Sequence, residues 1–163
     1  KMYFVESMPS AADFPHAIRR GIREVCRTML KAPVSLIGVK GIRKLARQVE
    51  IWPEKFGPEK ALLYLGQVIR MQEEIGTGGA GFRFIYAAFL QQAATLMGMP
   101  RLQELSAEMT AIGDRWRQFA VSGARNCKGR SRAEDSYPAM AAIIRECADR
   151  EAALYRELLA VAH

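Results

Sequence analysis

Hydrophobic residues recur along this chain at intervals of three and four residues, the spacing that is typical of amphipathic α-helices. The first stripe consists of Phe14, Ile18, Ile22, Val25 and Met29. Pro33 follows this stripe and ends the first predicted helix. Similar stripes predict further helices over residues 38–52, 58–75, 82–97, 102–119 and 140–161.

The predicted helix over 82–97 differs from the others because its residues are apolar nearly all round. A helix of this kind is expected at the centre of a bundle. One polar loop joins the predicted helices over 102–119 and 140–161, which predicts an antiparallel pair. We therefore expect an all-α fold: a single helical domain over residues 1–163, built as a bundle of about six helices around a buried central helix.

Composition excludes several classes of protein. Half of the 163 residues are hydrophobic and a quarter are charged, which is ordinary for a domain that folds around its own core. No run of 18 apolar residues is present, and the N-terminus lacks the order of a signal peptide. The three cysteines show no CxxC spacing, and we interpret Cys26 and Cys147 as small buried hydrophobic residues. We expect a cytoplasmic protein without a metal site.

The net charge of +7 is concentrated in the first third of the chain. Residues 1–52 hold 10 Lys and Arg against 4 Asp and Glu, whereas residues 53–163 hold 14 against 13. Four arginines lie opposite the first apolar stripe: Arg19, Arg20, Arg23 and Arg27. This basic face could contact nucleic acid, an anionic membrane or an acidic protein. Neither the face nor the basic stretch 125–132 interleaves aromatic residues, so nucleic acid is a disfavoured partner. We expect no membrane partner.

A glycine-rich segment is the most informative local feature of the sequence. It runs directly into the helix predicted over 82–97 and reads Gly76, Thr77, Gly78, Gly79, Ala80, Gly81. Exposed backbone amides beside a helix N-terminus can bind an anion. The segment is neither a Walker motif nor a dinucleotide-binding fingerprint, because no Gly-Lys-Ser/Thr follows it and no strand precedes it. The alternative is a tight connection between helices, in which glycines permit positive φ and close packing.

Arg83 occupies the first turn of this apolar helix, where the helix dipole disfavours a positive charge. A buried arginine requires a carboxylate, carbonyl groups or a bound anion. Glu73 and Glu74 are the internal partners that we expect; the alternative is an anion shared with the glycine-rich segment. We interpret Glu151, on the last apolar stripe, as a structural partner for an arginine rather than a catalytic carboxylate.

The sequence gives little support for any catalytic residue. His16 and His163 form no recognisable arrangement with a serine or cysteine nucleophile. Cys127 lies among basic residues that could lower its pKa, but a single cysteine without a base is poor support for catalysis. We therefore assign no catalytic and no metal-binding residue, and we do not expect this chain alone to be an enzyme.

The run from Ile75 to Ala94, with its Gly-Thr-Gly-Gly, Phe-Arg, Tyr and Phe-Leu groups, resembles the core of a known domain. This is the C-terminal domain of unknown function in proteins similar to butirosin biosynthesis protein H. The run Gly38 to Leu45, with Trp52 and Trp116, fits the same pattern, so the resemblance extends over about residues 14–122.

The resemblance implies an acyltransferase-like context. In that family the domain follows an N-terminal domain similar to cysteine peptidases that process leader peptides, and nothing here corresponds to it. The butirosin protein moves an amino-acyl group from the phosphopantetheine thioester of an acyl carrier protein onto an aminoglycoside amine. We therefore expect the C-terminal part of a longer protein: an accessory domain, without a cofactor of its own, for aminoglycoside-type natural-product biosynthesis.

Two kinds of partner follow from this interpretation. One is the cysteine-peptidase-like domain, in cis or in trans. The other is an acidic acyl carrier protein, with its phosphopantetheine phosphate near Gly76, Thr77, Gly78, Gly79, Gly81 and Arg83. The alternative is a structural oligomerisation or protein-interaction domain, such as a homodimer, in which loop and arginine are purely structural.

Overall fold

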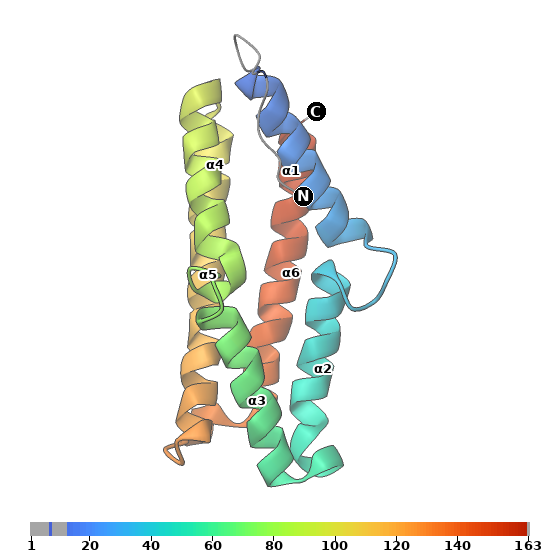
Figure 1. The fold of residues 1–163 in the computed structure, drawn as a ribbon, viewed down its shortest axis with the longest axis vertical. Helices are drawn as coiled ribbons and strands as arrows, with labels where there is room; N and C mark the ends of the chain where they lie inside the picture. Colours follow the sequence, from blue (N-terminus) through green and yellow to red (C-terminus); the bar gives the residue numbers. More distant parts are fainter. Residues whose placement is uncertain (1–6, 8–12, 163) are drawn as a thin grey trace.

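The computed structural model describes residue 7 and residues 13–162, and these residues form six α-helices and two short 3₁₀ turns (Figure 1). The helices are α1 (Phe14–Lys31), α2 (Gly38–Phe56), α3 (Pro58–Glu73), α4 (Arg83–Met97), α5 (Pro100–Cys127) and α6 (Tyr137–Val161). The turns are η1 (Ala80–Phe82) and η2 (Ala133–Asp135). The all-α prediction is confirmed, with no strand among the described residues. His163 lies outside them.

Local sequence explains where the helices begin and end. The side chain of Asp13 accepts a hydrogen bond from the His16 amide at 3.0 Å and caps α1. Proline lies in the first turn of α3, α5 and α6. Backbone N–H groups in a first turn have no acceptor within the helix, so the missing N–H of proline costs no hydrogen bond there. Gly98 has a positive φ of 62° and ends α4 with a left-handed residue.

The long helices α5 and α6 run antiparallel, as predicted, and the four shorter helices lie along them in two successive pairs (Figure 1). Helices α1 and α2 follow one another along α6. Helices α3 and α4 follow one another along α5. Each of these pairs forms one interrupted rod, so the six helices are arranged as a four-rod bundle in which two rods are broken.

The buried centre of the bundle is formed by α5 and α6 and not by α4. Helices α5 and α6 each bury eleven residues, whereas α4 buries four. Helix α6 lies between the two interrupted rods in Figure 1. One face of α4 packs on α5, while Ile85 and Leu96 on the other face are exposed. The sequence-based placement of the helix over 82–97 at the centre was wrong because apolar composition does not fix how many neighbours a helix has.

Glycines in α5 bring the interrupted rod of α3 and α4 close to it. A Cβ atom at Gly113 would lie 2.7 Å from the Phe84 ring, and one at Gly123 would lie 2.5 Å from Ile69 Cδ1. Cys26 and Cys147 are completely buried, as predicted. Within the described part of the chain, none of the helices combines the length and apolar character needed to cross a membrane.

Candidate functional site

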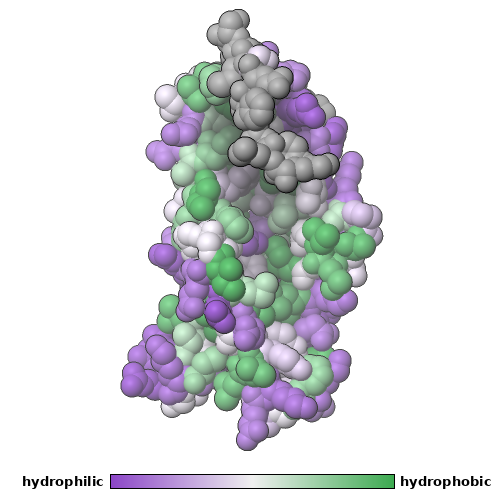
Figure 2. All heavy atoms as spheres, viewed as in Figure 1, coloured by the Kyte–Doolittle hydropathy of each residue, from purple (hydrophilic) through white to green (hydrophobic). Residues whose placement is uncertain are grey.

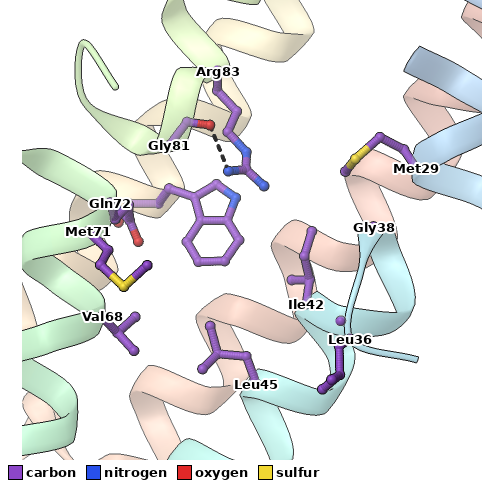
Figure 3. A pocket seen from close by; sticks show the side chains of 12 residues that line it. Met29, Leu36, Gly38, Ile42, Leu45, Val68, Met71, Gln72, Gly81 and Arg83 are labelled. Atoms are coloured by element: carbon purple, nitrogen blue, oxygen red, sulfur yellow. Dashed lines mark hydrogen bonds between the residues drawn. The ribbon is translucent and has the colours of Figure 1, made fainter. Parts of the chain in front are cut away.

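The α1–α2 connection and the α3–α4 connection, where the two rods are interrupted, meet at an open pocket of about 470 Å³. We call this pocket the cleft. One side is formed by the end of α1, the connection 32–37 and the start of α2; the other is formed by α3 and the residues around Arg83. Figure 2 shows a hollow between two groups of hydrophobic residues on this face, and Figure 3 shows the lining side chains from close by. The cleft is lined by Met29, Leu36, Gly38, Gly41, Ile42, Leu45, Val68, Met71, Gln72, Gly81, Arg83 and Trp116.

The end of α1 and the connection 32–37 pack so tightly against the first turn of α2 that two residues of this turn must be glycine. A Cβ atom at Gly38 would lie 2.4 Å from the Met29 carbonyl oxygen, and one at Gly41 would lie 2.4 Å from the Leu36 carbonyl oxygen. The connection leaves apolar side chains on the surface beside the cleft, and Leu36 is 70% exposed. Across the cleft, Met71 of α3 is 64% exposed. Exposed apolar residues on facing walls are typical of a binding surface.

The glycine-rich segment folds back on its own chain. All four glycines have positive φ, as do Ala80 at 49° and Phe82 at 69°. The Thr77 side chain is buried, and its hydroxyl accepts from the Gly79 amide at 3.3 Å. The Phe82 amide donates to the Thr77 carbonyl oxygen at 3.2 Å. These contacts match the tight helix connection that the sequence left as an alternative.

Arg83 is neutralised by Glu151 of α6, which is fully buried. Its Nε donates to Glu151 Oε1 at 3.0 Å, and its Nη2 donates to Glu151 Oε2 at 3.1 Å. Its Nη1 donates to the Gly81 carbonyl oxygen at 3.0 Å (Figure 3). A Cβ atom at Gly81 would lie 2.6 Å from Nη1, so a side chain at this position would displace the guanidinium. Glu151 is thus an arginine partner, as predicted.

Trp116 of α5 completes this buried polar cluster. Its indole Nε1 donates to Glu151 Oε1 at 2.7 Å, and the Arg83 guanidinium carbon lies 4.7 Å from the centre of its rings. The cluster therefore joins α4, α5 and α6 at the level of both rod breaks. Charge-assisted hydrogen bonds of this kind are among the strongest in a protein interior.

The expected internal partners of Arg83 were wrong. Glu74 instead pairs with Arg70 at 4.0 Å, and Glu73 pairs with Arg117 at 3.8 Å. Glu73 Oε1 also accepts from the Ala80 amide at 3.1 Å. A carboxylate therefore already occupies part of the amide-rich surface where an anion was predicted, and the geometry favours the structural alternative for this segment.

Gln72 is a cleft residue that the sequence analysis overlooked. Its Nε2 donates to Glu73 Oε1 at 2.8 Å and to the Trp116 carbonyl oxygen at 3.0 Å. Its Oε1 is buried and has no hydrogen-bond donor among the described residues. One signal could have found it: Gln72 continues the apolar stripe of Leu65 and Ile69, where a polar side chain is unexpected.

The basic face of α1 is divided in the structure. Arg23 Nη1 donates to the Ala162 carbonyl oxygen at 2.8 Å and so caps the end of α6. Arg19 Nη2 lies 3.9 Å from Met99 Sδ. Arg20 and Arg27 are exposed, and Arg27 lies 3.6 Å from Glu24. Two of the four arginines therefore contact other helices rather than forming one continuous surface.

Cys127 does not have the activated thiol that its basic neighbours suggested. Its sulfur donates weakly to the Leu62 carbonyl oxygen of α3 at 3.7 Å. Partial burial raises the pKa of this thiol, which is the opposite of the expected shift. Nearby, Asp135 lies 3.6 Å from Arg125 and offsets part of the basic stretch. No three His, Cys, Asp or Glu side chains gather as a metal site within residues 13–162.

These observations define a helical-bundle domain with an open apolar cleft above a neutralised polar cluster. The chain matches the family described as Domain of unknown function (DUF4872) over residues 1–158, and it belongs to that family. No curated protein and no solved structure matches the chain.

Proposed function

We propose that this protein is a docking domain that binds an acidic partner protein through the cleft and the neighbouring α1–α2 connection. The observation that carries the proposal is the pair of exposed apolar walls, represented by Leu36 and Met71, on opposite sides of one pocket. Apolar walls contribute most of the free energy of association, because their contact with a partner removes them from water.

The charge around the cleft indicates which sign of charge a binding partner carries. Residues 25–49 contain no Asp or Glu and six basic residues: Arg27, Lys31, Lys40, Arg43, Lys44 and Arg47. Arg43 pairs with Asp149 at 2.7 Å, and Lys40 donates to the Ala32 carbonyl oxygen at 3.3 Å. Lys31 and Lys44 line further hollows next to the same connection. An acidic partner would be attracted to this surface and oriented by it.

The resemblance to butirosin biosynthesis protein H-like proteins suggests which partners to test. An acidic acyl carrier protein of aminoglycoside-type natural-product biosynthesis has the required charge, and it would bring a phosphopantetheine arm. A cysteine-peptidase-like domain, in cis or in trans, is the other partner that the resemblance implies. In this proposal the chain is an accessory domain of an acyltransferase-like protein and performs no chemistry itself.

Titration with an acidic acyl carrier protein, followed by amide chemical shifts, tests this function. Resonances of residues 31–45 and 68–72 should shift, and the affinity should fall about tenfold or more in Lys31→Glu and in Leu36→Asp. Matched controls are Arg130→Glu and Leu63→Asp, which place the same changes on exposed residues outside the cleft. Equal losses in the controls, or unchanged shifts in residues 31–45, would rule out docking at this surface.

A second candidate function is self-association through the exposed face of α4. This helix and its C-terminal flank contain no charged residue from Phe84 to Pro100, and Leu96 is 64% exposed. In a chain of net charge +7, an uncharged face is where two copies can meet without electrostatic repulsion. Light scattering should then show a dimer that Ile85→Lys abolishes and Leu63→Lys preserves. A monomer at every concentration would exclude this candidate.

A further inference from the structure

We infer that the inner end of the cleft binds a neutral apolar group carrying a hydrogen-bond donor, and that it discriminates against anions. This inference deepens the proposed docking function and rests on it, insofar as the group would be one that the partner presents. The physical basis is the contrast between apolar walls and a polar floor on which positive charge is already neutralised.

The walls of the cleft fit an aliphatic chain. Met29, Ile42 and Leu45 line one side, and Val68 and Met71 line the other. A volume of about 470 Å³ lies within the range of small-molecule pockets, roughly 300 to 1,000 Å³. Burial of each methylene group against such walls strengthens binding about fourfold.

The floor does not favour negative charge. All three guanidinium nitrogens of Arg83 donate to acceptors of the chain itself, and the fully buried Glu151 supplies the compensating charge. An anion that entered the cleft would lose its hydration and would find no unpaired positive charge to compensate for that loss. A neutral group avoids this penalty.

Gln72 gives the cleft a preference for a ligand that carries a hydrogen-bond donor. The residue is 8% exposed, and its nitrogen faces two acceptors, Glu73 Oε1 and the Trp116 carbonyl oxygen. This arrangement fixes the orientation of the amide, so the acceptor without a partner is the oxygen. Oε1 is buried, so a ligand bonds to it only by displacing the side chains that cover it. An amide or hydroxyl group would provide the missing donor.

Three small probes separate these requirements. N-methylhexanamide has an apolar tail, no charge and one N–H; methyl hexanoate replaces that N–H with oxygen; hexanoate is an anion. The readout is the indole N–H resonance of Trp116, which lines the cleft. N-methylhexanamide should shift the Trp116 signal saturably, and the ester and the anion should each bind several-fold to tenfold more weakly.

Two variants of α3 locate the site. Val68→Phe fills the cleft from its wall and should abolish the shift, whereas Leu63→Phe lies on the same helix outside the cleft and should leave it unchanged. Equal or tighter binding of hexanoate or of the ester overturns the inference, as does a probe that shifts no Trp116 signal. Because the probes are free molecules, docking of an acidic protein and binding of a neutral group can fail independently.

Discussion

Glu151 shows how much of this structure depends on one side chain. Its two oxygens accept hydrogen bonds from Arg83 of α4 and Trp116 of α5, so three helices meet at a single buried carboxylate. The carboxylate compensates the guanidinium, and the guanidinium satisfies the carbonyl oxygen of Gly81 in the glycine-rich segment. A residue in the last helix therefore supports the conformation of a loop that lies about half the chain away.

Replacement of Glu151 by Ala should lower the free energy of unfolding by about 3–5 kcal/mol, because Arg83 would remain buried without a countercharge. Chemical denaturation measures this loss. The double variant Arg83→Met/Glu151→Leu should recover part of it, since neither charge is then buried alone. Glu74→Gln, in the exposed pair with Arg70, is the control and should change stability very little. A loss in Glu151→Ala no larger than in this control would show that the cluster is not structural.

At the scale of the element, α4 combines two different apolar faces. Ala87, Leu90, Ala93 and Ala94 are buried on the side toward α5, while Ile85 and Leu96 are exposed on the opposite side. Small residues on the inner face allow α4 to approach α5 closely. The outer face mixes Ile85, Ala88 and Leu96 with Gln91, Gln92 and Thr95. It carries no charge, and for this reason hydrophobic composition placed the helix at the centre of the bundle.

Truncation should distinguish the two faces of α4. Leu90→Ala removes a completely buried side chain and should cost about 2–5 kcal/mol of unfolding free energy, because a cavity remains in the core. Leu96→Ala removes the same atoms from the surface and should change stability by at most about 0.5 kcal/mol. Denaturant titrations at low protein concentration measure both changes. A comparable loss in Leu96→Ala would mean that the outer face is covered in solution.

At the scale of the molecule, the helices could be predicted from sequence, but the cleft could not. Periodicity predicted each helix because side chains repeat on a local register, and Pro33 and Gly98 marked ends that the structure confirms. The cleft depends on two rod breaks meeting at one level, which follows from the packing of α2 on α6 and of α4 on α5. The partner of Arg83 was missed for the same reason, since Glu151 is 68 residues away.

Ion pairs between helices also give the whole bundle a predictable response to acid. A hydrogen bond from Arg145 of α6 lowers the pKa of Glu50 in α2, and one from Arg115 of α5 lowers the pKa of Glu146 in α6. A hydrogen bond from Ser122 of α5 lowers the pKa of Asp135 in η2, the turn that precedes α6. In each case the folded protein stabilises the ionised carboxylate more than the unfolded chain does, so acid should weaken contacts in the middle of α6 and in the turn before it.

These carboxyl groups have pKa values near 4 in the unfolded chain, and above that pH their full contribution to stability should be present. Stability should fall as the pH drops further, toward the lower pKa values that the groups have in the folded protein. Thermal unfolding followed by circular dichroism at pH 7, 5 and 3 should show little change between the first two and a lower Tm at the third. The variant Glu50→Gln/Glu146→Gln should lose stability at pH 7 and show a smaller drop toward pH 3, because two of the titrating groups are gone. An identical acid response in this variant would assign the transition to other carboxylates.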